Sequence, residues 1–360
     1  MHIRRWVLAS FAVALCAASV APMDPVFAQQ PDKKVVKAQQ EELQAVLKIA
    51  DAVTAGQPAP ADFTMTFSND FLKAQDGKMY IPFTLAIPAD SAPPANLTMY
   101  LRVVARNPPV AAAPPADAKD KKAKDDKNNR PEYAFEDAFS VDLRTPDPGQ
   151  PFRFSRAFTV PAGEFDVLLV LKERAPIEKK VKNAVYKTAV LKQPLTIPDF
   201  WNGTLATSSV ILAADVSPVS APMTPQELRE QPYTLGTTKI TPTPSNKLLK
   251  KGELSVVFII YNSKSDETSK KPDVTVEYGF YQKVATEPNG EKFFNKTNPQ
   301  NFNATTLPPQ FDPAVGHQLV AGQSVPLGSF PEGDYRLEIK VTDKLAGSTV
   351  THNLPFSVGS

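Results

Sequence analysis

Residues suited to proton transfer or metal binding are sparse in this chain. It has 360 residues and three histidines, and only His317 and His352 lie beyond an apolar N-terminal segment. A zinc site needs three or four convergent ligands, and two histidines this far apart show no recognisable ligand spacing. We expect one imidazole in a loop and the other on a strand surface. We expect no metal and no cofactor.

Residues for covalent catalysis are equally scarce. The single cysteine is Cys16, so the chain has no Cys-x-x-Cys site and no internal disulfide. It contains no Gly-x-Ser-x-Gly turn, no phosphate-binding glycine loop and no calcium loop. We therefore expect no catalytic residue and no enzyme. One alternative stays open, because two of the many acidic residues could converge as the carboxylate pair of a hydrolase.

Aromatic side chains are the best candidates for a binding role, since flat rings can lie against sugar rings. Trp201 is the only tryptophan beyond the N-terminal segment, and a second group of aromatic residues lies between positions 278 and 302. From these we take Trp201, Tyr281 and Phe294 as candidate binding residues. The alternative is that inward-facing members of the group fill a core and that Trp201 is wedged between domains.

The charges point away from nucleic acid. Forty basic and 38 acidic residues give a net charge of +2, and the lysines of residues 119–130 are interleaved with aspartates. A phosphate-binding patch would not carry so many acids, so we interpret this segment as a solvated loop. A sparser basic strip at 179–192 could meet an anionic envelope polymer, but a solvated hairpin is the simpler interpretation.

Residues 1–28 have the pattern of a secretory signal peptide. Arg4 and Arg5 precede an apolar stretch, and Val26 and Ala28 supply short side chains at a cleavage site before Gln29. The apolar stretch is shorter than a membrane-spanning helix, and no second stretch approaches that length. The sequence therefore predicts an exported protein, periplasmic or extracellular, with no transmembrane segment in the mature chain.

The elements that must position the aromatic residues are mostly strands. Apolar residues recur at helical spacing over 32–55, which predicts one amphipathic helix within 29–59 that packs on the first domain or, as the alternative, binds a partner. Beyond residue 60 the period changes to two. In the strand 97–103, for example, Tyr100 and Arg102 fall on the expected solvent face. Asp76-Gly77 and Asn289-Gly290 are typical hairpin turns.

The strands repeat at long range. Residues 77–83 match 252–258, 96–101 match 273–278, 161–170 match 331–340, and 194–197 match 355–358, in the same order. A period this long indicates two copies of one domain. Each copy offers about seven short strands, as in an antiparallel β-sandwich. Phe165 and Tyr335 are expected to begin equivalent strands and to point inward.

Two low-complexity segments interrupt this plan. Residues 108–130 are rich in proline, alanine and mixed charges, which predicts a disordered insertion in the first copy. Residues 217–250 are rich in proline and are interpreted as a linker or an edge crossing, preceded by a strand at 208–213 on the edge of the second domain. The expected organisation is a signal peptide (1–28), a helix (29–59) and β-sandwich domains at 60–199 and 200–360.

The segment 330–343, with its ending at 358, resembles the last strands of immunoglobulin-like modules in secreted bacterial proteins, of the kind found after von Willebrand factor A-related domains. Residues 195–212 are similar to the segment that enters such a module. The resemblance covers about 195–360 and, through the repeat, extends weakly to 60–199. It implies an immunoglobulin-like fold. The A-type domain carries a metal motif of the form Asp-x-Ser-x-Ser. Asp215 and Ser217 match its first two residues, but Val219 stands in place of the second serine, so the motif is missing.

Together these features predict an all-β protein of two tandem immunoglobulin-like antiparallel β-sandwiches, preceded by a signal peptide and one short helix. We expect a non-catalytic interaction or structural module of the cell envelope. A polysaccharide-binding module is the first alternative and a carboxylate-dependent hydrolase the second. The partner is an unknown envelope protein or polysaccharide, and the oligomeric state is open.

Overall fold

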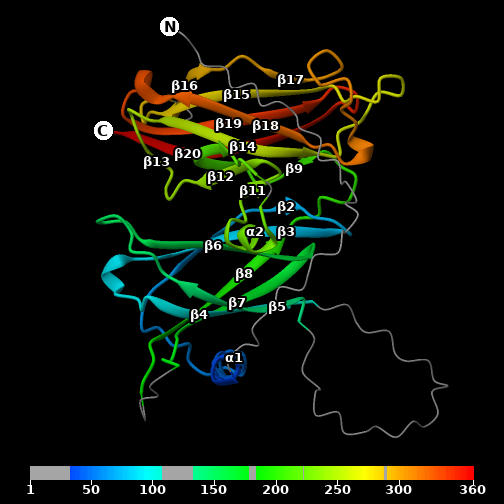
Figure 1. The fold of residues 1–360 in the computed structure, drawn as a ribbon. Helices are drawn as coiled ribbons and strands as arrows, with labels where there is room; N and C mark the ends of the chain where they lie inside the picture. Colours follow the sequence, from blue (N-terminus) through cyan, green and yellow to red (C-terminus); the bar gives the residue numbers. More distant parts are fainter. Residues whose placement is uncertain (1–32, 108–132, 178–183, 222, 288–289) are drawn as a thin grey trace, which may run out of the picture. The chain divides into compact units, whose positions relative to one another are not determined.

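A computed structural model describes residues 33–107, 133–177, 184–221, 223–287 and 290–360 (Figure 1). Contacts divide these residues into two compact units. The N-terminal unit comprises the described residues up to 69 together with 83–199, and the C-terminal unit comprises 70–82 and 200–360. The predicted signal peptide and the predicted insertion at 108–130 lie outside the described residues. No described helix is both long and apolar enough to cross a membrane.

The N-terminal unit holds one long helix and two antiparallel sheets. One sheet has the order β5-β4-β7-β8, and in the other β3 pairs with β1 and β6. Rings from both sheets meet between them, since Phe158 of β6 lies 5.9 Å from Phe135 of β5. The elements are α1 (Lys33–Thr54), β1 (Thr66–Asn69), β3 (Lys78–Ile87), η1 (Ala89–Ser91), β4 (Asn96–Ala105), β5 (Phe135–Asp142), β6 (Phe152–Pro161), β7 (Gly163–Glu173) and β8 (Thr188–Ile197).

The C-terminal unit is also built of two sheets. Their orders are β11-β12-β10-β14-β18, with β9 beside β14, and β13-β20-β19-β15-β16, with β17 beside β15. The unit includes β2 (Leu72–Lys73) and the first residues of β3. Its other elements are β9 (Ala206–Thr207), β10 (Ile211–Pro218), α2 (Pro225–Glu230), β11 (Thr234–Leu235), β12 (Thr238–Pro242), β13 (Lys247–Leu249), β14 (Glu253–Tyr261), β15 (Val274–Lys283), β16 (Glu291–Lys296), β17 (Gln300–Phe302), η2 (Pro313–Val315), β18 (Leu319–Pro326), η3 (Leu327–Ser329), β19 (Gly333–Asp343) and β20 (Ser348–Gly359).

The two units share one sheet plan, as the sequence repeat predicts. The order β5-β4-β7-β8 in one unit corresponds to β16-β15-β19-β20 in the other, and the pair β3-β6 corresponds to β14-β18. Gly163 and Gly333 begin β7 and β19 with nearly the same backbone angle, φ of 145° and 144°. Residues with a Cβ atom are strained in this left-handed region and glycine is not, which explains why glycine stands at this turn in both copies.

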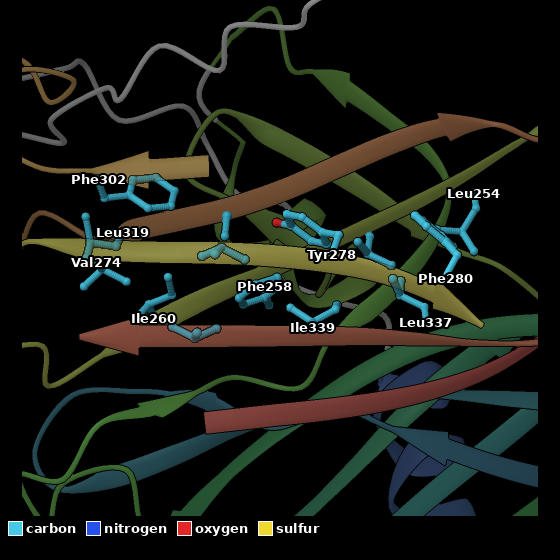
Figure 2. Close-up of a cluster of buried hydrophobic side chains, with 14 of the residues drawn as sticks. Leu254, Phe258, Ile260, Val274, Tyr278, Phe280, Phe302, Leu319, Leu337 and Ile339 are labelled. Atoms are coloured by element: carbon cyan, nitrogen blue, oxygen red, sulfur yellow. The ribbon is translucent and has the colours of Figure 1, made fainter. Parts of the chain in front are cut away.

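The core of the C-terminal unit lies between its two sheets (Figure 2). Leu254 and Phe258 of β14 face Tyr278 and Phe280 of β15, and the fully buried Tyr335 of β19 donates a 2.7 Å hydrogen bond to the Pro331 carbonyl. Phe165 of the other unit is also buried. The prediction that Phe165 and Tyr335 point inward is therefore confirmed, and the chain is an all-β protein of antiparallel sandwiches.

The helix α1 packs on the sheet of its own unit. Val46, Leu47 and Ala50 lie against Tyr100 and against Leu168 and Val170 of β7, and Figure 1 shows the helix beside β4 and β7. The interpretation that this helix packs on the first domain is confirmed. The expectation that Tyr100 and Arg102 face solvent is wrong, because α1 covers that face of β4.

The interpretation of residues 217–250 as a linker is also wrong. This segment holds α2 and the strands β11, β12 and β13 within the C-terminal unit. The predicted strand at 208–213 is β10, and it lies between β12 and β14 rather than at an edge. Pro218 and Pro242 end β10 and β12, where a missing backbone donor costs least. The proline content indicates a linker, but β11 pairs with the adjacent β12 and β12 pairs with β10, so the segment belongs to a sheet.

The predicted turn at Asp76-Gly77 joins β2 to β3. Both residues have positive φ, 53° and 71°, as this hairpin type requires. The second predicted turn falls partly outside the described residues, because Asn289 is not described. Gly290 does have a positive φ of 68°.

Candidate binding surface

Trp201 lies against the hairpin of residues 70–82 in the C-terminal unit. Its indole nitrogen donates a 2.9 Å hydrogen bond to the Lys78 carbonyl, and the Lys73 ammonium lies 4.0 Å from the centre of the ring. Lys73 also donates to the side-chain oxygen of Asn262 at 3.1 Å. Although 43% of Trp201 is exposed, its contacts hold this hairpin in place. Its position favours a structural role over stacking on a ligand.

Tyr281 and Phe294 lie on different sides of one sheet. The pairing of β15 with β16 shifts between Phe280 and Tyr281, so Phe294 is the extra residue of a β-bulge. Its ring packs against the core at 4.8 Å from Phe330. The bulge places the neighbouring Phe293 opposite Tyr281, with the ring centres 5.7 Å apart.

The exposed aromatic side chain at this position is therefore Phe293, not Phe294. Phe293 is 53% exposed. The sequence places it within the aromatic group at 278–302, but alternation alone does not show which of two adjacent phenylalanines faces outward. A bulge changes that assignment, and no residue type in this segment marks it.

Arg336 is the centre of a polar network beside Tyr281. Its Nε donates to both carboxylate oxygens of Glu291, at 3.1 and 2.8 Å, and its Nη1 donates to Glu338 at 2.8 Å and to the side-chain oxygen of Asn353 at 2.6 Å. The guanidinium carbon lies 4.3 Å from the centre of the Tyr281 ring. These contacts fix the guanidinium plane and both carboxylates.

The electrostatics of this network keep the arginine charged. Partial burial lowers the pKa of Arg336, but the hydrogen bonds to Glu338 and Glu291 outweigh it and raise the pKa above its ordinary value. One cation then binds two carboxylates, which leaves this cluster with a net negative charge. On the same side of the sheet, Glu277 lies opposite Lys340, Glu291 lies opposite Lys283, and Lys296 lies opposite Gly279.

A glycine keeps the centre of the face flat. Gly279 lies next to Tyr281 on the same side of β15, and a Cβ atom on it would lie 3.3 Å from a ring carbon of Tyr281. The ring can therefore lie close over the backbone. We call the exposed side of β16-β15-β19-β20, with Phe293, Tyr281, Arg336, Glu338 and Asn353, the outer face of the C-terminal unit.

The matching side of the N-terminal unit is covered. There α1 lies over β4 and β7, Arg102 binds Asp51 of the helix at 2.7 Å, and Lys172 binds Glu42 at 3.0 Å. By the repeat, Arg102 stands where the other copy has Gly279. Among the described residues, no helix packs on the outer face of the C-terminal unit.

The histidines do not form a site together. His352 lies on the same side of β20 as Leu354 and Phe356, 2.6 Å from the Thr207 hydroxyl, and burial lowers the pKa of its imidazole. The expectation that it lies on a strand surface is therefore wrong. The ring of His317 lies 5.7 Å from Phe311. Within the described residues, no group of three or more potential ligands is placed to hold a metal ion.

Comparisons with known proteins add little. No protein family and no curated protein matches the chain. Among solved structures, the crystal structure of a Salmonella alpha-2-macroglobulin mutant is similar over 84% of this chain and 17% of that one, at 12% identity and a TM-score of 0.21. The chain thus spans about a sixth of the length of that protein, and so low a score carries no argument about function.

Proposed function

We propose that this chain is a non-catalytic binding module of the cell envelope, exported to the periplasm or the cell surface, and that the outer face of its C-terminal unit is the binding surface. The observation that carries the proposal is the difference between the two copies. One copy uses its helix to cover this face, and the other presents an ordered set of aromatic and polar side chains to solvent.

The resemblance of residues 195–360 to immunoglobulin-like modules of secreted bacterial proteins supports this proposal. In such sandwiches the sheet edges and end loops are expected to carry binding, and here the exposed sheet face adds a further surface. Two carboxylates of the outer face, those of Glu291 and Glu338, are both bound by Arg336. That arrangement suits recognition better than proton transfer, so the hydrolase alternative gains no support from it.

The test is site-specific photo-cross-linking in the native envelope. A photoreactive phenylalanine analogue replaces Phe293 in the full chain, and the same analogue at Val315, an exposed residue of η2, is the control. We expect the analogue at position 293 to give either one discrete protein cross-link or a cross-link to polysaccharide. The analogue at position 315 should give neither. The same products at both positions, or none at 293, would contradict the proposal.

Export makes a separate prediction. If residues 1–28 are a signal peptide, the protein isolated from its native host begins at Gln29, because Val26 and Ala28 provide the short side chains that a signal peptidase requires. N-terminal sequencing and intact mass spectrometry measure this directly. Retention of Met1 on the protein recovered from the envelope would contradict it.

A further inference from the structure

We infer that the outer face of the C-terminal unit binds a neutral polysaccharide. This inference rests on the proposed function and names the ligand class of the same surface. A sugar ring presents apolar C–H groups on its faces and hydroxyl groups around its rim. A site for it therefore combines exposed rings with fixed hydrogen-bonding groups at their edge.

The register of the sheet places these two kinds of group in adjacent rows. Tyr281 lies opposite Phe293 on one side and Arg336 on the other, and Arg336 lies opposite Pro355. With neighbouring strands about 4.8 Å apart, this row runs for about 14 Å across four strands. In this row the Tyr281 and Phe293 rings meet edge-to-face at 76° and the guanidinium lies over the Tyr281 ring, so the exposed Phe293 supplies the ring surface for a sugar.

The second row supplies hydrogen bonds. Glu338 lies opposite Gly279 and opposite Asn353 in the register, next to the aromatic row. Both polar side chains bind Arg336, at 2.8 and 2.6 Å, and so are held in place before a ligand arrives. Their remaining lone pairs and the amide donors of Asn353 can bind hydroxyl groups, with little further loss of side-chain freedom.

The composition of the face argues against other macromolecules. Phe293 is the one large hydrophobic residue exposed on it among the described residues, whereas a stable protein interface needs an apolar centre within about 800 Å² per partner. The register places four acids and four bases on this side of the sheet, so it offers no positive strip for a phosphate backbone: Glu277, Glu291, Asp334 and Glu338, with Lys283, Lys296, Arg336 and Lys340. Because the charges are nearly balanced across strands, a neutral polymer fits better than an anionic one.

The experiment measures binding of the full mature chain to soluble polysaccharides by isothermal titration calorimetry and by gel retardation. The neutral probes are dextran, mannan, xylan and a mixed-linkage β-glucan, and polygalacturonate is the charged probe. We expect at least one neutral polymer to bind more tightly than polygalacturonate. Phe293→Ala should weaken that binding about tenfold, since a lost ring contact is worth roughly one factor of ten.

Controls separate this surface from others. Val315→Ala, at an exposed residue, should leave binding unchanged, and Asn353→Ala should weaken it without changing the melting temperature. Failure of every neutral polymer to bind overturns the inference. So does binding that survives Phe293→Ala but is lost in Trp201→Ala. A discrete protein product cross-linked at position 293, without polysaccharide binding, would overturn the inference and leave the proposed function standing.

Discussion

Replacing Arg102 by leucine is expected to lower the free energy of unfolding of the N-terminal unit by about 3 kcal/mol, as for a broken buried ion pair. The Arg102 side chain is fully buried beneath α1. Its Nη2 binds Asp51 at 2.7 Å, and its Nε donates to the Tyr100 hydroxyl at 2.8 Å. Leucine fills the space but leaves both partners without this donor. Because the Asp51 side chain is 58% exposed, water can resolvate it, which limits the loss.

The measurement is urea unfolding combined with hydrogen exchange of the α1 amides, because two units need not unfold as one. Arg106→Leu is the matched control, since Arg106 is 41% exposed and its pair with Asp166 should contribute less than about 1 kcal/mol. Amide protection in α1 should fall in Arg102→Leu and persist in Arg106→Leu. Equal protection in the two variants would show that Arg102 does not anchor the helix.

Stability of the C-terminal unit is expected to fall as pH rises from 4 to 7 because of Asp70. Burial raises the pKa of this carboxyl from 3.8 to about 6, although hydrogen bonds from Tyr233 and Ser209 favour the ionised form. The folded state therefore binds the proton more tightly than the unfolded state. The resulting stabilisation is fully present below pH 3.8 and is lost as pH rises through about 6. The effect is of order 1–3 kcal/mol.

Asp70→Asn provides the test. Asparagine keeps an oxygen that can accept the 3.0 Å hydrogen bond from the Tyr233 hydroxyl but carries no charge. Urea unfolding at pH 4 and pH 8 should show the variant gaining stability relative to the parent chain at pH 8 and much less at pH 4. His352 has a lowered pKa, so its contribution to stability rises with pH up to about 6.5. Both chains contain His352, and comparing them cancels this contribution. A difference that does not change with pH would refute the assignment.

Much of the fold could be predicted from alternation and repetition. The glycines at 163 and 333, followed by the inward rings of Phe165 and Tyr335, identify the same turn in both copies. The burial of Arg102 could not be predicted from the sequence. A lone arginine on an alternating strand is expected on the solvent face, and here a helix distant in sequence covers that face. The sequence predicts β10 at an edge for a different reason, because its neighbour β12 lies in a proline-rich segment that local composition does not mark as a strand.

The candidate surface was predictable only in part. Tyr281, chosen from the aromatic group at 278–302, does lie on the outer face. Phe294 and Phe293 exchange sides because of a bulge, which depends on how β16 pairs and not on its own residues. Arg336 and Asn353 appear in the sequence as ordinary polar positions of two strands. Only the register, which brings them beside Glu291 and Tyr281, gives them a common role.

The hairpin of residues 70–82 has a consequence for how the chain folds. It belongs to the C-terminal unit, where the Phe71 amide donates to the Ser209 hydroxyl at 2.9 Å and Tyr80 donates to the Pro232 carbonyl at 3.0 Å. During synthesis this hairpin emerges long before the segments that receive it. Contacts between such distant segments form slowly. The apolar residues of the hairpin therefore stay unburied until the C-terminal half has been made and folds around them.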